Sequence, residues 1–127
     1  MESPEVLFSG DVIRKPALVT ALDQLGAQGR VLICGAVYAE LCGFHPHLDT
    51  LLQQYGVSID PNMPLETWKR AGVAYAAYGK RRRASLPRRI LTDFLVGAHA
   101  SGGHHSLFTL NTGDYGDFPE VPLLTVR

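Results

Sequence analysis

Short runs of consecutive hydrophobic residues alternate along the chain with stretches in which hydrophobic residues recur every three or four positions. The runs predict buried strands at residues 5–8, 31–34, 57–59 and 107–110, with a short edge strand at 121–124. The helical spacing predicts helices at residues 18–25, 37–42, 47–55, 64–79 and 90–100, the last capped by Thr92 or a nearby residue. We expect turns at Ser9–Gly10 and at residues 101–103, and a basic loop at 80–89 around Pro87.

Strands that alternate with helices are typical of a parallel sheet covered by helices on both faces. We therefore predict one α/β domain over residues 1–127, with a central parallel sheet of four to five strands. The length of 127 residues suffices for a single core, and a content of 46% hydrophobic and 19% charged residues excludes a disordered chain. In such sheets ligands bind beyond the carboxyl ends of the strands, where the strand order reverses.

Composition also indicates the cellular location of the protein. No hydrophobic run approaches the roughly 20 residues that a membrane span needs, so we expect no contact with a membrane. The N-terminal residues Met1–Glu5 are acidic and lack the basic start of a secretory signal. Two cysteines, Cys34 and Cys42, are too few for a disulfide framework, and we expect a cytoplasmic protein.

Acidic residues follow several of the predicted strands. Asp11 lies just past the first strand, Glu40 on the helix after the second, Asp93 at the start of the helix before the fourth, and Asn111 and Asp114 after the fourth. Carboxylates that converge at one sheet edge repel one another unless a cation lies among them. Oxygen ligands suit Mg²⁺ or Mn²⁺, and the matching chemistry is metal-assisted hydrolysis of a phosphodiester. The alternative is that these acids only cap helices and end strands, as the helix dipole alone favours for Asp93.

Three segments resemble the acidic motifs of PIN-domain ribonucleases, in particular the toxins of bacterial VapBC-type toxin–antitoxin systems. They are Ala36–Leu41, Ile90–Ala100 and Leu107–Tyr115, and Pro119–Leu124 is similar to the closing turn and last strand of that family. The resemblance implies a flavodoxin-like α/β fold and Mg²⁺-dependent cleavage of RNA. It also implies inhibition by a cognate antitoxin and a tendency to form homodimers.

By this resemblance, Glu40, Asp93 and Asp114 are the catalytic residues and hold the metal, and Asn111 orients a ligand or a substrate phosphate. The first motif departs from the family pattern, because Ser9 stands where the first catalytic aspartate belongs and Asp11 follows two positions later. Either Asp11 enters the metal site or the site lacks one carboxylate. The alternative function is therefore a catalytically impaired PIN-fold module that binds an antitoxin or RNA without cutting.

The charge is unevenly distributed although the net charge is zero. Residues 69–92 contain eight basic residues and no acidic residue. Arg81, Arg82, Arg83 and Arg88 precede the Asp93 helix, and we expect them to bind RNA phosphates, since arginine binds phosphate in a bidentate manner. An acidic antitoxin segment and a simple solvated loop are the competing explanations.

Two further hypotheses have weaker support. The five histidines invite a zinc site, but adjacent residues such as His104 and His105 rarely chelate one ion, and we expect surface loop residues there and a packed helix residue at His99. A phosphoacceptor receiver domain would place its acceptor at Asp60 after the third strand, but it needs an acidic pair at Ser9–Gly10, which is absent.

Overall fold

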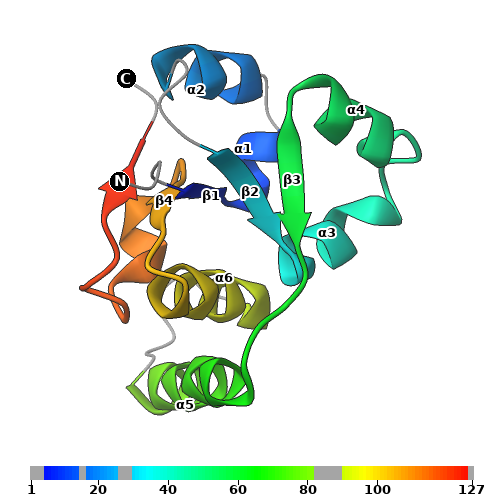
Figure 1. Cartoon of the computed structure of the whole chain (residues 1–127). Helices are drawn as coiled ribbons and strands as arrows, with labels where there is room; N and C mark the ends of the chain where they lie inside the picture. Colours follow the sequence, from blue (N-terminus) through cyan, green and yellow to red (C-terminus); the bar gives the residue numbers. More distant parts are fainter. Residues whose placement is uncertain (1–4, 15–16, 26–29, 82–89, 126–127) are drawn as a thin grey trace.

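The computed structural model describes residues 5–14, 17–25, 30–81 and 90–125. A five-stranded, all-parallel sheet forms the centre, with strand order β3-β2-β1-β4-β5 (Figure 1). The strands are β1 (Glu5–Phe8), β2 (Arg30–Cys34), β3 (Val57–Asp60), β4 (Ser106–Phe108) and β5 (Leu123–Leu124). The predicted α/β class with a parallel sheet of four to five strands is confirmed.

The helices lie on both sides of this sheet. They are α1 (Gly10–Arg14), α2 (Ala17–Leu25), α3 (Gly35–Cys42), α4 (Leu48–Gln54), α5 (Leu65–Arg81) and α6 (Leu91–Gly102), with a 3-10 helix η1 (Thr112–Tyr115). The chain proceeds from β1 to β3 in one direction across the sheet and then returns to β4 on the other side of β1. Because parallel crossovers are right-handed, this reversal sends α5 and α6 to the face opposite α1 and α2, as Figure 1 shows.

The central strands are buried, which explains why they are continuous hydrophobic runs in the sequence. Leu7, Phe8, Ile33 and Leu107 are fully buried, and the rings of Phe8 and Phe108 lie 5.3 Å apart on neighbouring strands. Helix α6 is buried along most of its length, and at Gly97 a Cβ atom would come within 2.4 Å of the Phe118 ring. These contacts fix the position of the helix that carries Asp93.

Three local differences from the predicted elements have simple causes. Gly10 begins α1, where we expected only a turn, and α6 continues to Gly102 through part of the turn expected at residues 101–103. Lys80 and Arg81 belong to α5 instead of the basic loop, since both residues favour helices and their charge suits a helix C-terminus. Of the predicted alternatives for the cap of α6, the structure has the nearby residue and not Thr92, since the Asp93 carboxylate accepts the Ile90 N–H at 3.3 Å.

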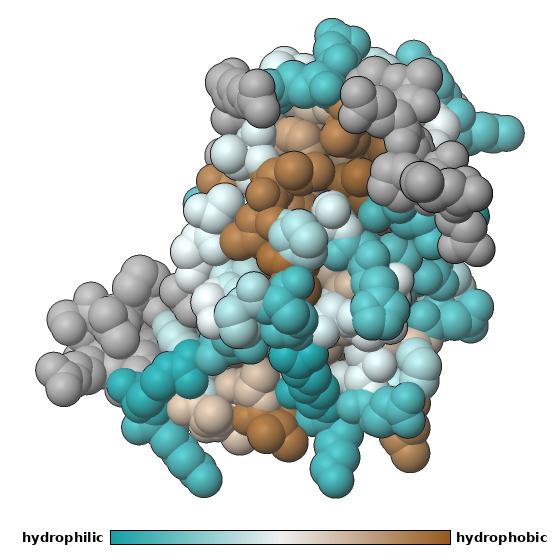
Figure 2. All heavy atoms as spheres, turned by 60° about the vertical axis from the view of Figure 1, so that its left-hand side comes forward, coloured by the Kyte–Doolittle hydropathy of each residue, from teal (hydrophilic) through white to brown (hydrophobic). Residues whose placement is uncertain are grey.

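The edge strand β5 is partly open. Leu123 and Leu124 are each more than a third exposed, and Figure 2 shows this side of the molecule, crossed by a band of hydrophobic residues between hydrophilic ones. In the part of the chain that the structure describes, no helix has the length and hydrophobicity to cross a membrane.

Candidate active site: the acidic cluster

Four acidic residues lie around the point where the strand order reverses, between β1 and β4. Asp11 is in the first turn of α1, directly after β1, and Glu40 is on α3, which follows β2. Asp93 is in the first turn of α6, and Asp114 is in η1 after β4. We call these four residues the acidic cluster. Their positions agree with the general rule that ligands bind at the carboxyl ends of parallel strands.

Asp93 shows that the four charges act on one another. Its pKa is raised, first by burial and then by the charges of Asp114, Glu40 and Asp11. The hydrogen bond from the Ile90 N–H opposes the rise, because it stabilises the ionised form. Asp93 therefore caps α6 and also belongs to the acidic cluster. The two interpretations of the sequence, a helix cap and a member of a charged cluster, are compatible for this residue.

Asp11 is held by hydrogen bonds from the segment that follows β4 and from Ser9. The Asn111 side-chain amide donates to Asp11 Oδ2 at 2.8 Å, and the Leu110 N–H donates to Oδ1 at 3.4 Å. The Thr109 hydroxyl donates to Oδ2 at 3.4 Å, and the Ser9 hydroxyl donates to Oδ1. The Asp11 carboxylate, two positions after Ser9, thus lies against residues of the motif Leu107–Tyr115.

Thr109 and Tyr115 lie beneath these carboxylates, and the sequence pattern alone did not single them out. Thr109 is fully buried and its hydroxyl accepts the Asn111 N–H at 3.1 Å. The pKa of the buried Tyr115 is raised, first by burial and then by the charges of Asp93, Asp11 and Asp114. Both residues belong to the motif Leu107–Tyr115, and their place in that motif is the signal that could have identified them.

The donor set of the acidic cluster fits a hard divalent cation. It consists of carboxylate oxygens and one amide, the ligands that Mg²⁺ and Mn²⁺ prefer. A divalent cation would offset the mutual repulsion that raises the pKa of Asp93. Among the described residues, no three of these four carboxylates come within 4.8 Å of one another, whereas another group, treated below, does. Mg²⁺ keeps several water ligands and takes only one or two carboxylates directly.

Of the four arginines predicted to bind RNA, only Arg81 is described. Arg81 ends α5 and forms an ion pair with Asp117, and its guanidinium carbon lies 5.4 Å from the centroid of the Tyr78 ring. Arg82, Arg83 and Arg88 lie outside the described residues. The charge of Arg81 is therefore already opposed by a carboxylate, which weakens its predicted part in binding phosphate.

The histidines do not all behave as expected. His99 is a packed helix residue, as predicted, but His105 is buried and is not a surface loop residue. Burial lowers the pKa of His105, which favours the neutral form of its ring. The cause is tertiary: the residue lies under the sheet, immediately before β4, and Gly103 leaves room for its ring.

The receiver-domain alternative does not fit the sheet. In receiver-type sheets the third strand lies beside the first, at the point where ligands bind. Here β3 is an edge strand, separated from β1 by β2, and the Asp60 carboxylate lies 3.0 Å from His99 Nε2, within hydrogen-bond distance. Asp60 therefore lies away from the acidic cluster and is not placed as a phosphoacceptor.

Comparison with known structures identifies the fold. A chain in the structure of VapBC2 from Rickettsia felis bound to a DNA fragment from its promoter matches 97% of this chain and 99% of its own length, at a TM-score of 0.70 and 16% identity. VapBC-1 from nontypeable Haemophilus influenzae gives 0.69 and 16%, covering 95% of this chain and 97% of the other. DNA-bound VapBC from Salmonella typhimurium gives 0.64 and 11%, covering 98% and 99%.

No family model and no curated protein sequence matches the chain. At 11–16% identity the structural matches establish the fold and not the activity. The protein has the PIN-like α/β fold found in VapBC structures, as the sequence motifs predicted.

Proposed function

We propose that this protein is a metal-dependent endoribonuclease and the toxin component of a toxin–antitoxin pair. The observation that carries the proposal is that Asp11, Glu40, Asp93 and Asp114 come from four separate segments around the switch in strand order, where the charges of the other three help burial to raise the pKa of Asp93. Four acids from four separate segments thus act on one point at the switch in strand order. A structural role in capping α6 would need Asp93 alone, whereas binding of a divalent cation needs the group.

In this proposal Glu40, Asp93 and Asp114 hold Mg²⁺ or Mn²⁺, and Asp11 is the fourth acid. The ion lowers the pKa of water and stabilises charge on the phosphate and the leaving oxygen. Asn111 fixes the Asp11 carboxylate through its 2.8 Å hydrogen bond, so it orients an acid of the site and not only the substrate. Thr109 and Tyr115 exclude water from beneath the cluster, which strengthens the electrostatic interactions above them.

We propose an antitoxin as the protein partner. The matching structures include VapBC proteins, two of them bound to DNA. The surface of α5 supports a protein contact, since Leu65 is 83% and Val73 60% exposed and Trp68 and Tyr75 are only partly covered. We expect either a homodimer or the antitoxin to cover these side chains, and RNA to reach the acidic cluster in a cytoplasmic protein.

The second candidate function is a PIN-fold module that binds without cutting. The observation in its favour is Ser9, which stands at the position of the first acid and donates to Asp11 Oδ1. Both oxygens of Asp11 already accept hydrogen bonds, which limits how many further bonds this carboxylate can make.

A cleavage assay distinguishes the two functions. Purified full-length protein is incubated with a pool of structured and single-stranded RNAs in Mg²⁺ or EDTA. If the protein is a nuclease, we expect cleavage in Mg²⁺ that disappears in EDTA and in Asp93→Asn. The control variant Asp23→Asn, which removes an exposed carboxylate on α2, should cleave RNA as the wild type does. Binding of RNA without cleavage in the wild type would favour the module.

A further inference from the structure

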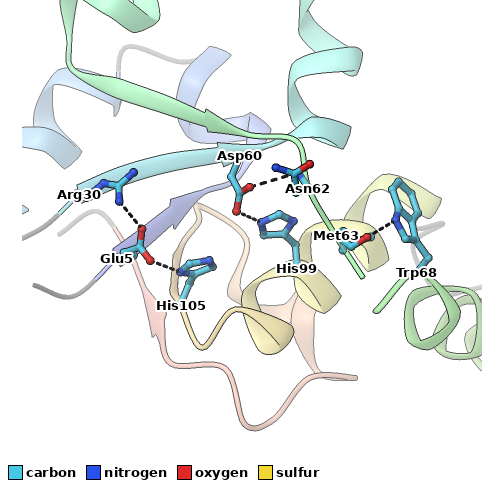
Figure 3. A network of polar contacts seen from close by, with 8 residues as sticks. All are labelled: Glu5, Arg30, Asp60, Asn62, Met63, Trp68, His99 and His105. Carbon is cyan, nitrogen blue, oxygen red and sulfur yellow. Dashed lines mark hydrogen bonds and ion pairs between the residues drawn. The ribbon is translucent and has the colours of Figure 1, made fainter. Parts of the chain in front are cut away.

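Asp60, His99 and His105 form a second polar cluster beneath the sheet. We call it the histidine cluster. Asp60 ends β3, His99 lies on the third turn of α6, and His105 immediately precedes β4, so the three residues come from distant parts of the chain. Figure 3 shows their side chains turned toward one another, with Glu5 and Arg30 beside them. One ligand atom from each of the three lies within 4.8 Å of the other two.

The contacts within the histidine cluster are close and its interior is largely closed to water. His99 Nε2 lies 3.0 Å from Asp60 Oδ2, and the rings of His99 and His105 are stacked at 5.8 Å with an interplanar angle of 18°. Both histidines are 5% exposed. Asp60 is about a third exposed at its side chain and opens the cluster to solvent on one side.

One nitrogen of the cluster has no hydrogen-bond partner among the described residues. This atom, His105 Nδ1, is fully buried. Its nearest carboxylate oxygen, Glu5 Oε1, lies 3.9 Å away, beyond hydrogen-bond distance, and Glu5 is itself paired with Arg30 at 3.3 Å. Leaving a buried nitrogen unsatisfied is costly, so such atoms are rare without a ligand or a function.

We propose that the histidine cluster is a binding site for Zn²⁺, distinct from the acidic cluster. Two imidazole nitrogens and one carboxylate oxygen are the ligands that zinc takes. Mg²⁺ binds oxygen ligands and is not suited to this set. Asp60, His99 and His105 each give one ligand, and the exposed side of Asp60 leaves a fourth position for water.

The ion would link the end of β3 and the last turn of α6, already joined by the Asp60–His99 contact, to His105 at the start of β4. Because α6 also carries Asp93 at its first turn, zinc would hold in place the helix that positions one acid of the other cluster. Zinc would thereby stabilise the fold without taking part in the chemistry at the acidic cluster.

Calorimetric titration of ZnCl₂ into the chelator-treated, full-length protein tests the proposal. With Mg²⁺ in excess to occupy the acidic cluster, we expect one Zn²⁺ per chain and a higher thermal midpoint as zinc exceeds its dissociation constant. Asp60→Asn and His105→Gln should each weaken binding by about 100-fold or more, at least the loss caused by removing a second-shell partner. Co²⁺ in place of zinc should give the visible absorption of a tetrahedral site in the wild type and not in Asp60→Asn.

Three control variants separate this site from other zinc ligands. His104→Gln changes an exposed neighbour, His45→Gln with His47→Gln removes the histidines of another loop, and Asp93→Asn alters the acidic cluster. All three should bind zinc as the wild type does. Asp60→Asn changes a partly exposed residue and keeps its shape, so circular dichroism should show an intact fold even if His105→Gln is unstable. Absence of binding in the wild type, unchanged binding in Asp60→Asn, or loss of binding in the control variants would each overturn the proposal.

Discussion

The side-chain amide of Asn111 donates a hydrogen bond of 2.8 Å to Asp11 Oδ2, joining residues 100 positions apart. Asp11 follows β1 and Asn111 follows β4, and these two strands are neighbours at the point where the strand order reverses. The bond therefore ties the two edges of the acidic cluster together. It also explains how Asp11 reaches the site from two positions beyond Ser9, since α1 begins at Gly10 and turns the carboxylate toward β4.

We predict that Asp93→Asn abolishes RNA cleavage and raises the thermal midpoint in EDTA. The folded-state pKa of Asp93 is raised, so ionisation of this group at neutral pH opposes folding. Asparagine removes the charge and keeps an oxygen that can accept the Ile90 N–H, so the α6 cap remains. Asp93→Ala, which loses the cap as well, should be less stable than Asp93→Asn by about 1 kcal/mol.

The same prediction has a pH dependence with a definite sign. A group whose pKa is raised on folding contributes stability below its unfolded-state pKa, and this contribution is lost as the pH rises through the folded-state value. The advantage of Asp93→Asn over the wild type should therefore be full at neutral pH and vanish as the pH falls below the ordinary range of an aspartate. Melting curves of both proteins from about pH 3 to about pH 8 in EDTA test this, and an advantage that grows toward acid pH would contradict it.

We predict that Asn111→Ala lowers RNA cleavage more than it lowers stability. Loss of the bond to Asp11 frees one carboxylate of the cluster, while a partly exposed hydrogen bond contributes only about 0.5–1.5 kcal/mol to folding. Urea unfolding gives the stability and initial cleavage rates give the activity. Thr112→Ala, which changes an exposed neighbour, is the control. Equal cleavage rates for Asn111→Ala and the wild type would show that Asn111 stabilises only the loop after β4 and does not orient Asp11 for cleavage.

Two glycines should respond to alanine in opposite directions. At Gly97 an added Cβ would come within 2.4 Å of the Phe118 ring, and such overpacking costs about 1–3 kcal/mol. At Gly72, in the exposed part of α5, no atom lies within 4 Å of an added Cβ, and alanine should stabilise the helix by about 1 kcal/mol. Urea unfolding measures both, and a stable Gly97→Ala would show that α6 packs differently against Phe118.

The basic segment should contribute to RNA binding through Arg82 and Arg83 more than through Arg81. Arg81 is already paired with Asp117, so its substitution by alanine should change the salt dependence of binding little. Substitution of Arg82 and Arg83 should flatten the slope of log affinity against log salt by about one unit for each phosphate that is no longer neutralised. An unchanged slope in Arg82→Ala with Arg83→Ala would assign the segment to solubility or to the antitoxin.

The sequence was most informative where burial is simple. Strands such as residues 31–34 are buried on both faces, so they appear as unbroken hydrophobic runs, and β2 follows that run within one residue. The positions of Glu40 and Asp114 after strands, and of Asp93 at the start of the helix before β4, followed from the same pattern. Features that depend on tertiary packing could not be found in this way.

His105 illustrates that limit. In sequence it follows Ser101–Gly102–Gly103–His104, which is typical of an exposed turn, and only the packing of α6 under the sheet buries it beside His99. Asp60 is similar, since nothing near it in the sequence indicates a partner 39 positions away. The five-residue helix α1 was missed because a serine–glycine pair favours a turn and a helix this short has no hydrophobic periodicity.

If the acidic cluster is a metal site, its four carboxylates together bind a divalent cation. Titration of Mn²⁺, followed by its electron paramagnetic resonance signal, measures this directly in the wild type and in Glu40→Gln, Asp93→Asn, Asp114→Asn and Asp11→Asn. We predict that each of these variants binds Mn²⁺ at least about tenfold more weakly than the wild type, because each removes one carboxylate from the site. The two controls, Asp60→Asn in the histidine cluster and Asp23→Asn on α2, should bind Mn²⁺ as the wild type does. Equal affinity in all variants, or a loss confined to Asp60→Asn, would contradict it.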